Sequence, residues 1–150
     1  MHAATAPRPA GTRDVRFLEL VNTVSSVPMA RHIVADDLRA TGIPESVLES
    51  VIAVVTELVS NAVLHARPVS LTDAGEGVVL RWAVTNRHVL VNVTDGGGPE
   101  EPTLKASPIE EPEGRGLAIV DALARDWSVR SEDDQVTVQA VVGPWESRSE

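Results

Sequence analysis

The chain has 150 residues, of which 43% are hydrophobic, so it can form one domain with a sizeable core. Its formal net charge of -9 excludes broad nucleic-acid binding, which needs Lys and Arg to neutralise phosphates, and the absence of cysteine excludes disulfides and thiolate metal sites. No apolar run is expected to cross a membrane, and residues 1–13 lack the apolar core of a signal peptide, so we expect a cytoplasmic protein.

The first half of the chain predicts a strand and two helices. Residues 16–24 mix apolar and β-branched side chains, which favours a strand. A helix is predicted from Pro28 to about Ala40, and Gly42 ends it because glycine suits the left-handed turn after a helix. The strongest helix runs from Glu45 to about His65, where apolar residues cover most of the surface and predict burial.

The second half predicts short strands and one more helix. A hairpin is expected around a turn at Asn86-Arg87-His88, and a second hairpin closes the chain. The expected elements are strands at 69–71, 78–85, 89–94, 127–130 and 136–142, and a helix from Gly116 to about Arg125. This order predicts an α+β fold, a two-layer sandwich of a mixed, mostly antiparallel sheet with helices on one face. The domain is expected over 14–142, between a flexible tail at 1–13 and a polar tail at 143–150.

Glu57, Asn61 and His65 form the first candidate constellation. Their four-residue spacing places them in one polar stripe on a mostly apolar helix. Buried polar groups need partners, so this stripe could hold a metal-bound ligand and a water. The same spacing also suits the solvent-facing side of an amphipathic helix, and the three residues alone leave both interpretations open.

Asp95 and the glycines after it form the second constellation. Alternation along residues 89–95 places the valines and Asp95 on one face, so Asp95 should point inward and need a donor such as the amino group of adenine. Glycine at 96–98 would let the backbone approach a flat ring closely. A capped Asp-Gly turn is the alternative interpretation.

The third constellation is Gly114-Arg115-Gly116-Leu117, placed before the last predicted helix. Free N–H groups at a helix N-terminus attract phosphate, and glycines let it come close. The long segment 99–113 before it has no periodicity and is rich in Pro and Glu, which is typical of a lid. Walker-type loops, HExxH and GxSxG motifs are absent.

In this order, the three motifs resemble the GHKL ATPase superfamily, which has the Bergerat-type ATP-binding fold. Residues 57–66 (ELVSNAVLHA) resemble its N box, and the two glycine-bearing motifs resemble its glycine boxes. The phrase GRGLAIVDAL and the chain length are similar to the stand-alone anti-sigma-factor serine/threonine kinases of bacteria. The resemblance covers residues 16–142.

The resemblance implies a set of roles by position. Asn61 would ligate Mg²⁺ on the ATP phosphates, and Glu57 would be the general base for a serine hydroxyl. Asp95, supported by Gly97, would bind the adenine amino group, and Thr137 would help to hold adenine. The phosphates would be lined by Gly114, Arg115, Gly116 and Leu117. His65 matches an N-box position that carries no assigned role.

Three functions follow for such a protein. The first is a kinase that sequesters a sigma factor and phosphorylates a STAS-type anti-anti-sigma partner, with no direct nucleic-acid or membrane contact and in some members as a homodimer. The second is a nucleotide-gated module that regulates a sigma factor or another protein without phosphoryl transfer. The third is a partner-binding domain that has lost ATP.

Overall fold

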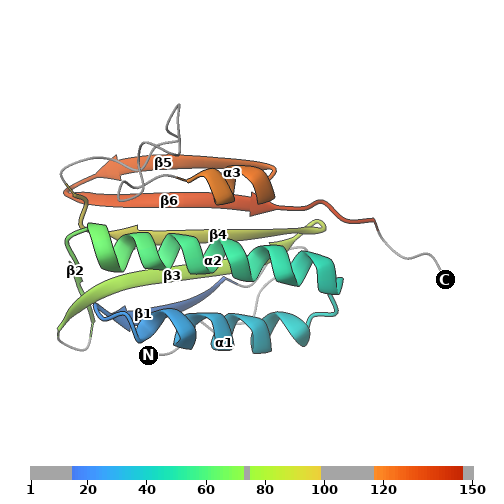
Figure 1. The fold of residues 1–150 in the computed structure, drawn as a ribbon, viewed down its shortest axis with the longest axis horizontal. Coiled ribbons are helices and arrows are strands. Elements are labelled where there is room, and N and C mark those ends of the chain that lie inside the picture. The colour runs from blue at the N-terminus through green and yellow to red at the C-terminus, as the bar shows by residue number, and fades with distance from the viewer. Residues whose placement is uncertain (1–14, 73–74, 99–116, 147–150) are drawn as a thin grey trace.

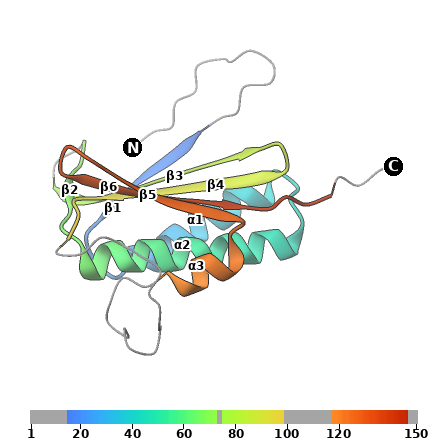
Figure 2. The ribbon, with the colours of Figure 1, turned by 90° about the horizontal axis from the view of Figure 1, so that it is seen from above.

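A computed structural model describes residues 15–72, 75–98 and 117–146, which form two layers (Figure 1). Seen from above, the three helices cover one face of a single sheet (Figure 2). The two-layer α+β prediction is therefore confirmed. The elements in chain order are β1 Arg16–Val21, α1 Ser26–Arg39, α2 Glu45–His65, β2 Val69–Ser70, β3 Glu76–Thr85, β4 His88–Asp95, α3 Ala118–Leu123, β5 Asp126–Glu132 and β6 Gln135–Val142.

The sheet has six strands in the order β1-β3-β4-β6-β5, with β2 paired to β3. Every pairing between the described strands is antiparallel, whereas a mixed sheet was predicted. The two hairpins explain much of this topology, because each joins neighbouring strands through a two-residue turn. Asn86 and Arg87 turn the first hairpin, Asp133 and Asp134 the second, and all four have positive φ. Asn and Asp tolerate this left-handed conformation better than most side chains.

The helix α2 occupies the bounds predicted for it. It is long and apolar enough to cross a membrane by length and composition alone, which the sequence analysis did not expect. In the fold it is a core helix: Val51, Val54, Val55 and Val59 are fully buried. The apolar run is therefore accounted for by packing inside the domain. Gly42, with a φ of +80°, lies in the connection from α1, as predicted.

Strand alternation sends two sets of side chains to opposite faces of the sheet. On β4, Val89, Val91 and Val93 are buried in the core beneath the helices. Their partners on β6 are Val142, Ala140 and Val138, which belong to the same core. The intervening residues of β4 and β6 point to the face without helices. This alternation decides which side chains can reach a site under the helices.

The segment after β6, predicted as a polar tail, is in contact with the domain as far as Glu146. Trp145 packs against the core, and its backbone N–H donates to the Arg87 oxygen at 3.3 Å. The Arg87 guanidinium donates in turn to the Trp145 oxygen at 2.8 Å. Residues 143–146 are thus attached to the β3–β4 turn. The rest of both predicted tails lies outside the described residues.

Candidate functional site

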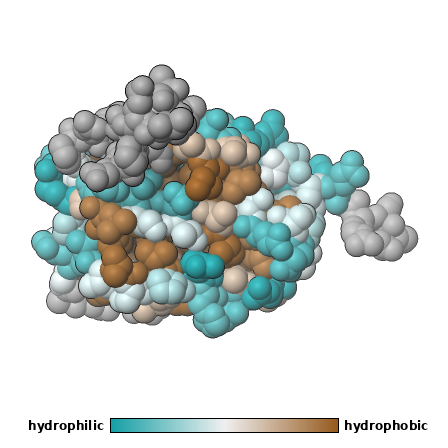
Figure 3. Space-filling model, in the orientation of Figure 1, coloured by the Kyte–Doolittle hydropathy of each residue, from teal (hydrophilic) through white to brown (hydrophobic). Residues whose placement is uncertain are grey.

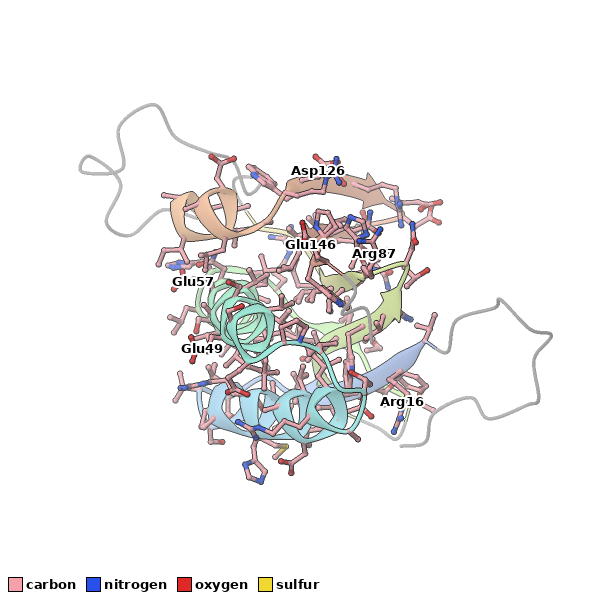
Figure 4. The ribbon with its side chains drawn as sticks, turned by 90° about the vertical axis from the view of Figure 1, so that its right-hand side faces the viewer. Arg16, Glu49, Glu57, Arg87, Asp126 and Glu146 are labelled. Atoms are coloured by element: carbon pink, nitrogen blue, oxygen red, sulfur yellow. The ribbon has the colours of Figure 1, made fainter. Side chains whose placement is uncertain are left out.

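The middle residue of the polar stripe on α2 does not face solvent. Asn61 is buried, with 9% of its surface exposed, while Glu57 and His65 are half-buried on either side of it. Glu57 lies on the side of α2 that points away from the sheet, as does Glu49 (Figure 4). One helical turn separates the carboxylate of Glu57 from the amide of Asn61. The structure therefore favours the interpretation of a buried polar site over that of a solvated face.

The Asn61 amide nitrogen, Nδ2, is buried and has no hydrogen-bond partner among the described residues. Leaving a buried polar group unpaired costs about 1–3 kcal/mol, so such a group marks a place where a ligand can supply the missing partner. A half-turn of the side-chain amide exchanges its nitrogen and its oxygen, so either atom can occupy the buried position. The end of the amide that lacks a partner can therefore present its oxygen to a cation.

Asp95 lies at the end of β4, where only 1% of its surface is exposed. Its Oδ1 accepts the backbone N–H of Gly97 at 2.7 Å, which fixes the orientation of the carboxylate. Gly97 has a φ of +81°, a conformation that side chains rarely adopt. The predicted inward direction of Asp95 is confirmed, and it arises from the alternation that also buries Val93.

A backbone clamp joins the Asp95 loop to the end of α2. The N–H of Arg67 donates to the Gly97 oxygen at 2.6 Å, and the N–H of Gly96 donates to the Arg67 oxygen at 2.6 Å. The backbones approach so closely that a Cβ at Gly96 would lie 2.7 Å from the Pro68 oxygen. This clamp sets the position of Asp95 relative to the helix that carries Asn61. The sequence does not predict this contact of Gly96 with Arg67 and Pro68. The run of three glycines at 96–98 indicates only that the backbone there can approach another group closely.

The structure does not bring Thr137 to this site. Thr137 pairs with Thr94, and their hydroxyl groups are 2.8 Å apart on the face without helices. Val136 pairs with Asp95 and approaches Gly97, since a Cβ on Gly97 would lie 3.3 Å from its Cγ2. A shift of one residue along a strand moves a side chain to the opposite face. The residue beside Asp95 is therefore Val136, and the placement of Thr137 near the adenine position is wrong.

The second glycine motif is described only at its end. Gly114, Arg115 and Gly116, and the predicted lid at 99–113, lie outside the described residues. Leu117 is 1% exposed and precedes α3, which is shorter than the predicted helix and ends at Leu123. Leu117 is therefore anchored in the core directly before α3. Because α3 contacts α2, the end of the motif lies near α2.

A metal site made by the protein alone is absent from the described part of the chain. No group of three or more His, Asp or Glu side chains is close enough together to hold an ion there. The amide of Asn61 and the carboxylate of Glu57 could each supply one oxygen to a cation. Such a site would need oxygens from a ligand, such as phosphate, to complete the coordination of a hard divalent cation.

Comparisons with known proteins agree with the fold. The family model described as "Histidine kinase-like ATPase domain" matches residues 20–142. Among solved structures, the crystal structure of the RsbU and RsbW domains of Rv1364c from Mycobacterium tuberculosis matches with a TM-score of 0.64 and 22% identity. That match covers 91% of this chain but only 32% of the other, so this chain spans about a third of its length. No curated protein matches the chain.

Proposed function

Because the chain belongs to the histidine kinase-like ATPase domain family, whose model matches it from residue 20 to residue 142, we propose that it is an anti-sigma factor with serine/threonine kinase activity. It binds Mg-ATP, sequesters a sigma factor, and phosphorylates a STAS-type anti-anti-sigma protein. The observation that carries the proposal is the buried amide nitrogen of Asn61, which has no partner in the described part of the chain and lies one helical turn from Glu57.

The nucleotide would lie between α2 and the Asp95 loop. The Asp95 carboxylate would accept a hydrogen bond from the amino group of adenine. The positive φ of Gly97 would let the backbone approach the ring. Asn61 holds Mg²⁺ through its amide oxygen, a ligand type that this hard cation accepts. Gly114, Arg115 and Gly116, with the backbone of Leu117, line the phosphates. The chemistry that Mg²⁺ supplies when bound is neutralisation of charge on the phosphates.

Glu57 would act as the general base in phosphoryl transfer. Its carboxylate takes the proton of the acceptor serine hydroxyl while that oxygen forms a bond to the γ-phosphorus. The bond from the γ-phosphorus to the β–γ bridging oxygen breaks, and ADP leaves with that oxygen. Half-burial supports this role, because Glu57 is within reach of a docking protein and close to Asn61.

The proposed partners are proteins of the cytoplasm. The RsbU and RsbW domains named in the matching structure support a regulatory context, and the net charge of -9 supports the absence of a nucleic-acid contact. The proposed protein contacts neither a membrane nor a nucleic acid directly. It can act as a homodimer.

ATP binding tests the nucleotide half of the proposal. Titration calorimetry with Mg-ATP should show binding to the native chain, and Asn61→Ala should lose the magnesium-dependent part. Asn92→Ala is a matched control, because Asn92 also has a buried and unpaired amide atom but lies on the sheet face without helices. Equal magnesium-dependent binding by both variants would overturn the assignment of Asn61.

Phosphate transfer tests the catalytic half. The chain is incubated with Mg-ATP and each STAS-domain protein of the source organism, and intact masses are measured. One partner should gain one phosphate, and Glu57→Gln should reduce the rate by about 100-fold or more, as expected for removal of a general base. Glu76→Gln, an exposed change at the start of β3, should leave the rate unchanged. ATP binding without transfer to any partner would favour the nucleotide-gated module.

A further inference from the structure

A groove runs along the outer side of the helix layer, between α1 and α2. Its volume is about 670 Å³, and it ends beside Glu57, where Ile119 of α3 forms part of its wall. The helix layer faces the viewer in Figure 3, which shows apolar surface interrupted by polar residues. Ile119 is 47% exposed there. The groove and its rim therefore present apolar surface to solvent.

The two walls of the groove carry opposite charges. The α1 wall presents two cations, Arg31 and Arg39, together with His32. Of these, His32 and Arg39 lie 3.4 Å and 3.9 Å from Asp36 on their own helix, at exposed positions where such pairs contribute little. The α2 wall presents its own row of charges along one side of the helix, namely Glu45, Glu49 and Glu57. A basic wall thus faces an acidic wall along the groove.

No ion pair joins the two walls among the described residues. The apolar side chains that line the groove between the charged ones are called its floor here: Ala35, Leu48, Ile52 and Ala53. Ile52 and Ala53 are only half-buried. Apolar surface gains free energy when it is removed from water, and separated opposite charges gain most from a ligand that bridges both walls. The groove is therefore incomplete without an elongated ligand of mixed charge.

We propose that this groove binds an amphipathic helix of a partner protein, with acidic residues along one flank and basic residues along the other. Its apolar stripe covers the floor, because a third helix packs into the surface of two others at an axis distance of about 8–10 Å. The acidic flank meets Arg31 and the basic flank meets Glu49. The identification of this partner as the phosphate acceptor rests on the proposed function, because the groove ends at Glu57.

Three synthetic helical peptides with the same apolar stripe test the charge pattern. One has Glu on one flank and Lys on the other, the second has Glu on both flanks, and the third has Lys on both. Exchanging the two flanks is no control, because a helix can reverse its direction in the groove. Measured by fluorescence anisotropy at low ionic strength, the mixed peptide should bind about 10-fold more tightly than either single-sign peptide.

Charge reversal in the wall should change that ranking in a defined way. Arg31→Glu replaces one of the two arginines of the α1 wall by an acidic residue, so the all-Lys peptide should become the tightest ligand. Glu49→Lys makes the neighbouring α2 wall more basic, so the all-Glu peptide should gain affinity relative to the native chain. Arg130→Glu is the matched control, because this exposed residue of β5 is not among those that line the groove, and it should leave the ranking unchanged.

Two results would overturn the inference. One is an unchanged peptide ranking in Arg31→Glu with the fold intact by circular dichroism. The other is a native chain that binds no peptide but whose self-association, measured by sedimentation, is lost in Arg31→Glu, which would assign the groove to a second copy. Peptide binding needs no ATP. A chain that binds the mixed peptide but transfers no phosphate would therefore support the groove inference and contradict the proposed kinase activity.

Discussion

Replacing Gly96 by alanine isolates the backbone clamp between α2 and the Asp95 loop. A Cβ at this position would lie 2.7 Å from the Pro68 oxygen and 2.8 Å from the Arg67 oxygen. Both atoms belong to the backbone, so no flexible side chain can move aside. Relief to an ordinary contact of 3.4 Å requires a displacement of about 0.7 Å, and the two 2.6 Å hydrogen bonds of the clamp must absorb it.

The displacement should affect stability and ATP binding together. Overpacking of this kind costs about 1–3 kcal/mol of the free energy of unfolding. A site is held to within about 0.5 Å of its working geometry, so moving Asp95 away from the helix that carries Asn61 should weaken ATP binding by about 10-fold or more. Urea denaturation measures the first quantity, and titration calorimetry with Mg-ATP measures the second.

Gly143→Ala separates a local effect from a general loss of stability. Its Cβ would lie 2.7 Å from the Arg87 oxygen, and its φ of +121° adds strain. It therefore carries a similar steric cost, but at the β3–β4 turn instead of the clamp. ATP affinity should stay within about twofold of the native value in this variant. If Gly96→Ala also binds ATP with native affinity despite its lower stability, the clamp does not position the site.

Two further predictions concern hydrogen bonds away from the site. Thr137→Val removes the 2.8 Å contact with Thr94 and should cost about 1 kcal/mol in urea denaturation, while calorimetry should show unchanged ATP affinity; a 10-fold loss would place Thr137 at the nucleotide after all. Asp37→Ala removes the acceptor of both the buried Trp82 indole N–H at 2.8 Å and the Arg16 guanidinium at 2.9 Å, and should cost about 1–3 kcal/mol. Asp37→Asn keeps an acceptor for Trp82 and should cost less, and an equal loss in both variants would contradict this assignment.

The elements that sequence predicts best are those whose signals are local. The bounds of α2 follow from a long row of apolar residues at helical spacing, which no neighbouring element has to complete. The turn at Asn86 and Arg87 follows from residues that tolerate a positive φ between two alternating strands. By contrast, α3 has only six residues, and a helix of this length depends on packing of residues such as Val120 for its bounds.

Strand alternation correctly predicted the face of the sheet to which Asp95 points. The same rule would also have predicted the face to which Thr137 points. Val136, Val138 and Ala140 are apolar at every second position of β6, which already indicates that Thr137 points to the other face. The resemblance assigned Thr137 to the adenine position from residue identity alone, and that assignment did not take the alternation of β6 into account. The clamp is different in kind, because it joins the backbones of Arg67 and Gly96, and a backbone contact between distant segments leaves no side-chain pattern to recognise.

A buried amide without a partner does not identify a site by itself, because Asn92 has the same property on the opposite face of the sheet. The two differ in their neighbours. Asn61 lies one turn from the carboxylate of Glu57 and on the helix that the clamp ties to the Asp95 loop. Asn92 lies between Arg81 and Gln139, its partners on the adjacent strands. Alanine at either position removes an unpaired group, so both variants should fold. Only the loss of Asn61 should abolish magnesium-dependent ATP binding, because only Asn61 lies one turn from a carboxylate on the helix that the clamp joins to the Asp95 loop.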